Sequence, residues 1–338
     1  MGEKDITEKL LEDYPDVFAD IFNVLVFNGE RRIKEDELSE SIVHSQYKAE
    51  DGRLHELERD VTKKWLKNNV SLSMFGIENQ TAVEKFMPLR VMGYDGASYR
   101  SQLLNLESEK RKLQKLRNEG RITEKEYASK ITKAYSDVCP VITIVLYFGT
   151  DRHWNESDTL KGILDIPEGL EKFVNDYRVH IFEIAWLSEE QIDMMTSDFK
   201  IVAKLFRDKR LGLNDIERDT TKITHIDEIL KLLKAVTGDV RYTDILKYDG
   251  YKEAENMCEL LDRLINERIE KERAIIKEKD EQLTQKEVQL IQKNEQLTQK
   301  EEQLSQKEVQ LIQKDEQLTE KDAIIEELRK QLAAYQNR

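Results

Sequence analysis

Three residues of one predicted β-hairpin have the types and spacing for metal-assisted phosphodiester chemistry. Asp60 precedes Glu78 by eighteen positions, and Gln80 follows two positions later. Side chains alternate between the faces of a strand, so Glu78 and Gln80 point the same way and Asn79 points the opposite way. If Asp60 lies on the antiparallel neighbour, its carboxylate can meet that of Glu78. Two adjacent carboxylates repel one another, and a divalent cation relieves that repulsion, which makes both candidate metal ligands.

The elements that must position these residues are predicted from apolar periodicity. Residues 57–66 and 70–80 are predicted to form a hairpin turned at residues 67–69. A capping-box pattern at Thr81 and Glu84 is expected to open the next helix, which runs to Gly120. The other predicted elements are a helix over 16–28, a second arm helix over 121–136, strands over 140–149 and 178–187, and mainly helical structure over 188–237.

The order of these elements favours an α/β fold. Two strands joined through a helix pair in parallel with a right-handed crossover. We therefore expect residues 70–80 and 140–149 to lie in one sheet, with the helices between them forming a charged arm. The predicted fold is a three-layer α/β core that holds Asp60, Glu78 and Gln80 near the sheet centre.

Several motifs, in a fixed order, give the chain a resemblance to a known family. They are Tyr14-Pro15-Asp16-Val17-Phe18-Ala19-Asp20, Glu78-Asn79-Gln80-Thr81, Met87-Pro88-Leu89-Arg90, the run from Tyr94 to Gln102, the strand at 140–149, and Phe182-Glu183-Ile184-Ala185-Trp186-Leu187. Over about residues 10 to 240 the chain resembles the Rpn family of recombination-promoting nucleases, also called YhgA-like transposases. That family is assigned to the PD-(D/E)XK nuclease fold.

The resemblance implies a role for each residue of the hairpin. Asp60 takes the place of the first acid, Glu78 that of the (D/E), and Gln80 that of the lysine. The family implies a cytoplasmic DNA endonuclease that uses Mg²⁺, or Mn²⁺, held by Asp60 and Glu78, with a role in DNA recombination or mobile elements. A metal-bound water loses its proton more easily and can attack phosphorus. Gln80 departs from the lysine of the broader fold, because an amide orients a water but neutralises no charge.

Other interpretations stay open at this point. Asp60 and Glu78 could form a structural pair bridged to Arg59 or to a lysine, and Gln80 could be a core glutamine bonded to backbone. The chain would then be a weak or inactive nuclease fold that acts as an assembly module through its tail. The same metal chemistry would also serve an RNA nuclease.

Further polar residues near the motifs have two interpretations each. Arg90 and Gln102, on the helix after the hairpin, either touch phosphate or are structural. Asp20 could add an acid to the site, although a helix acid is usually solvated. Lys63, Lys64 and Lys67, and the nine Lys or Arg against four Glu between positions 109 and 134, either track DNA or form a solvated surface.

Composition limits the class of protein. The 338 residues carry a formal net charge of −14, so DNA binding by overall charge alone is disfavoured. Cys139 and Cys258 stand far apart, which excludes a disulfide framework and fits a reducing cytoplasm. The charged N-terminus lacks an apolar signal core, and the longest apolar run, 141–148, is too short to cross a bilayer. We expect no membrane partner.

The C-terminal segment differs from the rest of the chain because it contains a direct sequence repeat. Residues 281–301 and 302–322 are two 21-residue copies with four differences, each made of three heptads. Leucine recurs every seventh position from Leu283 to Leu318, but the a positions carry mostly acids, so a long helix is expected and a homo-oligomer through it is left open. The predicted division is a nuclease-like domain over 10–240, a helical connector over 241–270 and a heptad-repeat, coiled-coil-like tail over 271–338.

Overall fold

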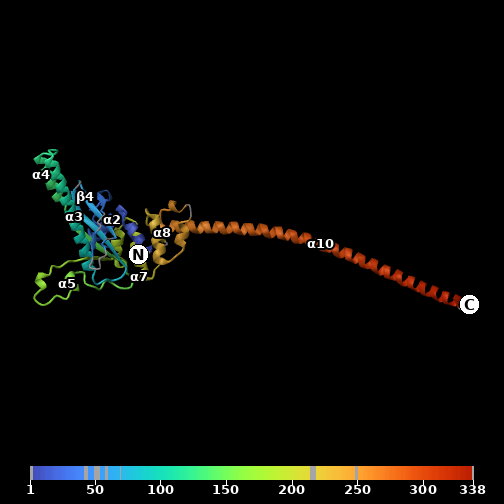
Figure 1. Ribbon diagram of the computed structural model, residues 1–338. Helices are drawn as coiled ribbons and strands as arrows, with labels where there is room; N and C mark the ends of the chain where they lie inside the picture. The colour runs from blue at the N-terminus through green and yellow to red at the C-terminus, as the bar shows by residue number, and fades with distance from the viewer. Residues whose placement is uncertain are drawn as a thin grey trace. The chain divides into compact units, whose positions relative to one another are not determined.

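The computed structural model describes residues 3–41, 45–48, 54–57, 60–68, 70–213, 218–247 and 250–336. The protein has an α/β fold built on a mixed five-stranded sheet, and a long helix ends the chain (Figure 1). Two compact units are distinguished, Met1–Leu264 and Ile265–Arg338. The boundary between them falls within the predicted connector.

The sheet joins an antiparallel half to a parallel half. Its order is β1 (Leu38–Glu40), β4 (Val61–Lys67), β5 (Val70–Gln80), β6 (Val141–Tyr147) and β7 (His180–Glu183). The pairs β1–β4 and β4–β5 are antiparallel, whereas β5–β6 and β6–β7 are parallel. A separate antiparallel pair consists of β2 (Ser45–Lys48) and β3 (Leu54–Leu57). The predicted hairpin is confirmed as β4 and β5, while β1 was not predicted.

The parallel crossover from β5 to β6 passes through two helices, as predicted. They are α3 (Met87–Asn118) and α4 (Glu124–Ser136). The predicted helix start at Thr81 is wrong, because α3 begins at Met87 with Pro88 in its first turn. A start at Thr81 would place Pro88 inside the helix, where its ring clashes and its missing N–H breaks a hydrogen bond. A capping box does form at Thr123, where it opens the next helix, α4.

The remaining helices only partly match the expected boundaries. The described residues of 188–237 are mainly helical, as predicted, in three separate helices. The strand predicted over 178–187 ends early, in the 3₁₀ turn Ile184–Trp186. The other described α-helices that precede the long last helix are α1 (Glu3–Glu12), α2 (Pro15–Leu25), α5 (Leu160–Ile163), α6 (Glu189–Met194), α7 (Phe199–Leu211), α8 (Ile226–Thr237) and α9 (Arg241–Ile245).

Helices cover both faces of the sheet. On one face Phe75 and Ile77 of β5 join a large buried cluster with residues of α2, α7 and α8. On the other face Val145 of β6 packs against Met87 and Val91 of α3. Because side chains alternate along β5, Glu78 and Gln80 belong to the face that α3 covers, and Asn79 belongs to the face of α2. This layering places the site residues between the sheet end and α3.

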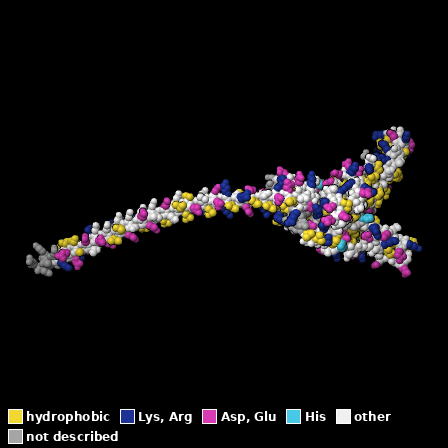
Figure 2. Space-filling view, turned by 180° about the vertical axis from the view of Figure 1, so that it is seen from behind, with side chains coloured by type: hydrophobic (Ala, Val, Ile, Leu, Met, Phe, Trp, Pro, Cys, Tyr) yellow, Lys and Arg dark blue, Asp and Glu magenta, His cyan; other side chains and the backbone are white. Residues whose placement is uncertain are grey.

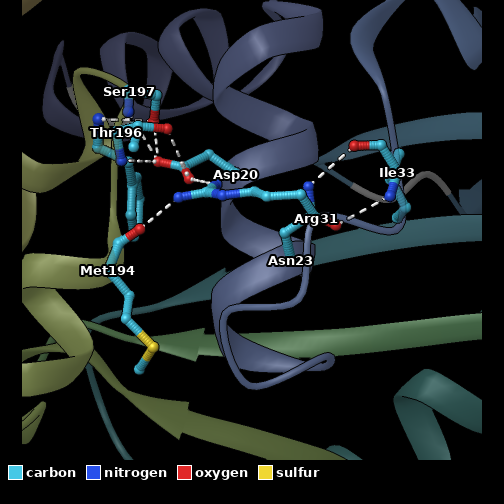
Figure 3. Close-up of polar contacts among 8 residues, drawn as sticks. Asp20, Asn23, Arg31, Ile33, Met194, Thr196 and Ser197 are labelled. Atoms are coloured by element: carbon cyan, nitrogen blue, oxygen red, sulfur yellow. Dashed lines mark hydrogen bonds and ion pairs between the residues drawn. The ribbon is translucent and has the colours of Figure 1, made fainter.

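Asp20 lies away from the hairpin, on the side of the sheet that α2 covers, and forms hydrogen bonds between two segments there. Its buried carboxylate accepts hydrogen bonds from the backbone N–H groups of Thr196, at 2.9 Å, and Ser197, at 2.8 Å. Figure 3 shows Arg31 reaching across to the same carboxylate and to the carbonyl of Met194. Asp20 is therefore neither a site acid nor a solvated helix acid; it connects α2 to the segment between α6 and α7.

The last helix, α10 (Met257–Gln336), has a buried start and an exposed continuation. Met257, Leu260, Leu261 and Leu264 are buried in the first unit, whereas residues 268–330 are exposed. Hydrophobic side chains recur along the exposed part (Figure 2), and the leucines of the heptad ladder, from Leu283 to Leu318, are 56–62% exposed. Among the described residues no helix has the length and apolarity to cross a membrane.

Candidate active site at the end of the central hairpin

The hairpin brings Asp60 beside the end of β5. Val61 pairs with Ile77 in antiparallel register, so the preceding residue, Asp60, falls opposite Glu78. The Asp60 carboxylate accepts a hydrogen bond of 2.7 Å from the backbone N–H of Asn79. Gln80 lies on the same face as Glu78, because its side-chain amide donates to Glu78 Oε1 at 3.2 Å. The structure thus brings together all three residues singled out from the sequence.

Glu78 is the buried acid of this group, with 1% of its surface exposed. Burial, and next the neighbouring Asp60 carboxylate, raise the pKa of Glu78 to about 7, against the opposing charges of Arg90 and Lys9. One carboxylate oxygen, Oε1, meets Arg90 Nη2 at 2.5 Å. The other oxygen, Oε2, is buried without a hydrogen-bond partner among the described residues. Glu78 therefore combines a readily protonated carboxyl with one unsatisfied acceptor.

Arg90 reaches the site from the first turns of α3. Its Nε donates to the Tyr94 hydroxyl at 2.9 Å, and its Nη1 meets Glu84 at 3.1 Å. Burial lowers the pKa of Arg90, but the Glu78 carboxylate and the hydrogen bond to Tyr94 raise it by more, so its pKa lies above the ordinary value. Because α3 begins at Met87, Glu84 lies in the preceding loop and contacts the Arg90 guanidinium from outside the helix.

Helix α1 adds two residues that the sequence analysis did not select. Lys9 Nζ lies 2.5 Å from Asp60 Oδ1. Glu12 is buried, and its Oε2 accepts a hydrogen bond of 2.6 Å from Asn79 Nδ2. Burial raises the pKa of Glu12 well above its usual range, against the hydrogen bond from Asn79, while nearby Asp60 adds to the increase. No spacing within α1 marks Lys9 and Glu12 as neighbours of the hairpin, because their contacts with Asp60 and Asn79 depend on tertiary packing.

Other polar residues have structural places. The Gln102 amide is buried on α3 and exchanges two hydrogen bonds with the Cys139 backbone, at 2.8 and 3.1 Å, which fixes α3 against the start of β6. Lys63 is buried and pairs with Asp13 at 2.7 Å, so it neither tracks DNA nor forms a solvated surface. Arg59 lies outside the described residues. Both cysteines are free.

The donor atoms of the site suit a hard cation. Among the described residues no group of three His, Cys, Asp or Glu side chains is arranged to hold a metal ion. Mg²⁺, however, is commonly bound by one or two carboxylates and keeps several waters. The orphaned Glu78 Oε2, beside the carboxylate of Asp60, supplies an acceptor that a hydrated cation would satisfy. These residues therefore fit a Mg²⁺ site of two carboxylates.

The comparisons with known proteins add no family name. No family model, no curated protein and no solved structure matches the chain. The resemblance to the Rpn family consequently remains a hypothesis that rests on the motifs quoted above.

Proposed function

We propose that the protein is a metal-dependent DNA endonuclease with a PD-(D/E)XK-like core. The observation that carries this proposal is the buried Glu78, with one unpaired oxygen, beside Asp60 at the end of the central hairpin. A buried acid with a raised pKa next to a second acid is a typical feature of functional sites. The family resemblance supplies the substrate class, DNA.

Each residue of the site has a defined task in this proposal. Asp60 and Glu78 would hold Mg²⁺ through carboxylate oxygens, and the bound ion would supply an activated water and offset negative charge on the phosphate. The Gln80 amide, which donates to Glu78 Oε1 at 3.2 Å, would orient that water through its carbonyl oxygen, which is a hydrogen-bond acceptor. Asn79, which donates its backbone N–H to Asp60, holds that carboxylate in place.

The test is nicking of supercoiled plasmid DNA by the full chain with Mg²⁺, compared with the Asp60→Ala and Glu78→Ala variants. We expect both variants to remain folded and to lose cleavage, because each lacks one of the two carboxylates. Gln102→Ala, which removes a buried amide of α3 away from these carboxylates, is the control for indirect effects on folding. Wild-type rates in either carboxylate variant would overturn the assignment. An RNA substrate in a parallel reaction separates the DNA nuclease from an RNA nuclease.

A second function is supported by one specific observation. Both carboxylates already have a cationic partner, Lys9 at Asp60 and Arg90 at Glu78, and Gln80 brings no positive charge. A nuclease fold neutralised in this way could be inactive and serve as an assembly module through its heptad-repeat tail. This alternative predicts no nicking with Mg²⁺ or Mn²⁺ by a folded wild-type protein, together with self-association that requires residues 271–338.

A further inference from the structure

The proposed site has a shortage of positive charge at the position where a phosphate would be cut. Negative charge builds on the phosphoryl oxygens in the transition state, and fixed donors aimed at those oxygens supply much of the catalysis in such sites. Gln80 carries only a dipole. Two other side chains, Lys9 and Arg90, bring positive charge to the carboxylates.

Arg90 is the better placed of the two to receive an anion. A guanidinium has five N–H donors, and three of its contacts, with Glu78, Glu84 and Tyr94, involve Nη2, Nη1 and Nε. Two N–H groups therefore keep no partner in the described part of the chain. The side chain is 38% exposed, whereas its partner Glu78 is 1% exposed. Arg90 thus spans from the buried acid to solvent.

The same three contacts fix the guanidinium before any ligand arrives. Glu84 and Tyr94 lie on either side of Arg90 along the chain, one in the loop before α3 and one a turn later in the helix. The Arg90 guanidinium also lies 5.8 Å from the centre of the Tyr94 ring. An arginine held in this way loses little side-chain entropy when a phosphate binds, and its planar fork suits two oxygens of one phosphate.

We propose that Arg90 binds the scissile phosphate. Resting on the nuclease function proposed above, the inference makes Arg90 a catalytic residue: its free N–H groups donate to a non-bridging phosphate oxygen and stabilise the charge that develops there. Arg90 supplies the positive charge that Gln80, in the place of a lysine, does not. The occupant is a phosphodiester anion, and Glu78 is the carboxylate shared between Arg90 and the metal site.

A purely positioning role makes a different prediction about metal affinity. If Arg90 only orients Glu78, its removal weakens Mg²⁺ binding. If Arg90 binds phosphate, Arg90→Gln removes a cation that competes for Glu78, so Mg²⁺ affinity stays the same or rises while cleavage falls. Calorimetric titration of the DNA-free protein with Mg²⁺ alone gives this readout independently of activity.

The experiment compares wild type, Arg90→Gln and the double variant Gln80→Lys with Arg90→Gln. We expect single-turnover nicking by Arg90→Gln to fall roughly 100-fold or more, and the added lysine to restore at least about a tenth of the wild-type rate by returning one positive charge. Arg263→Gln is the matched control: Arg263 lies outside the basic segment 109–134, is 31% exposed and pairs with Glu253 and Glu259, so its loss should leave the rate close to wild type.

The outcomes separate this inference from the proposed function. If folded wild-type protein does not nick DNA, the nuclease proposal fails. If wild type nicks and Arg90→Gln nicks equally fast, or binds Mg²⁺ more weakly and is not rescued by Gln80→Lys, the phosphate role of Arg90 is overturned. Should Arg90→Gln not fold, Arg90→Lys keeps the charge with fewer donors. It must then show a rate between those of wild type and Glu78→Ala, and a wild-type rate would refute the need for the planar fork.

Discussion

At the scale of single residues, Glu78 couples the site to pH. Its pKa of about 7, against 4.5 for the ordinary carboxyl, means that the folded protein binds this proton more tightly than the unfolded chain. The contribution of Glu78 to stability is therefore fully present below about pH 4.5 and is lost as the pH rises through 7. The buried Glu78 carboxylate therefore lowers the stability of the folded protein at neutral and alkaline pH.

Replacement of Glu78 by glutamine should remove that loss. Between pH 5 and pH 8, without metal, we expect the stability of Glu78→Gln to gain about 2 to 3 kcal/mol on that of wild type. Urea denaturation at the two pH values measures the difference. Glu84→Gln is the control, because Glu84 also contacts Arg90 but is 41% exposed. Parallel pH profiles for wild type and Glu78→Gln would contradict a raised pKa at Glu78.

At this scale the sequence predicts only part of the candidate site. Asp60, Glu78 and Gln80 are found because strand alternation and hairpin register are local rules that relate neighbours in one element. Lys9 and Arg90 reach the same point from helices on different sides of the hairpin. Their approach depends on how α1 and α3 pack, and no periodicity within either segment encodes it.

At the scale of elements, long apolar runs correctly predict the central strands, whereas the errors lie at the first and last residues of helices and strands. β5 and β6 were found because their buried side chains form nearly continuous runs, as expected of strands covered on both faces. β1 has three residues, and its pairing with β4 depends on tertiary contact rather than on its own composition. The misplaced start of α3 shows that the position of Pro88 outweighed a capping-box pattern.

Asp20 gives a prediction about how elements are held together. Asp20→Ala leaves the backbone N–H groups of Thr196 and of the buried Ser197 without their acceptor and Arg31 without its partner, so the free energy of unfolding should fall by roughly 3 to 5 kcal/mol. Arg31→Ala should cost roughly 1 kcal/mol, because Arg31 is 43% exposed. Urea denaturation of the two variants compares these losses directly. An equally small loss for both would mean that the Thr196 and Ser197 contacts are not essential to the fold.

At the scale of the whole molecule, the start of α10 belongs to the fold and its continuation does not. Met257, Leu260 and Leu264 are at most 5% exposed, and burial of each such side chain is worth about 1.5 to 3 kcal/mol. A chain that ends after Lys271 should keep the wild-type melting temperature and nicking rate. A chain that ends after Asn256 should unfold at a much lower temperature. Thermal melts of the two truncated chains, followed by the plasmid assay, measure this. Loss of nicking by a stable chain ending after Lys271 would place the tail within the enzyme.

The exposed tail should associate with a second copy only weakly near pH 7. Its leucine ladder offers one apolar position per heptad, while acids such as Glu301 and Glu308 occupy the other seam position, where a paired helix would bring them together. Protonation removes that repulsion, so association is favoured at low pH and lost as the pH rises. Sedimentation of the full chain at pH 5 and pH 8 should show more dimer at pH 5. The double change Glu301→Ile with Glu308→Ile should produce dimer at pH 8 as well, whereas the chain ending after Lys271 should stay monomeric at both pH values. Equal association of the full chain at the two pH values would show that the acids do not face one another, and that the leucines bind a different surface.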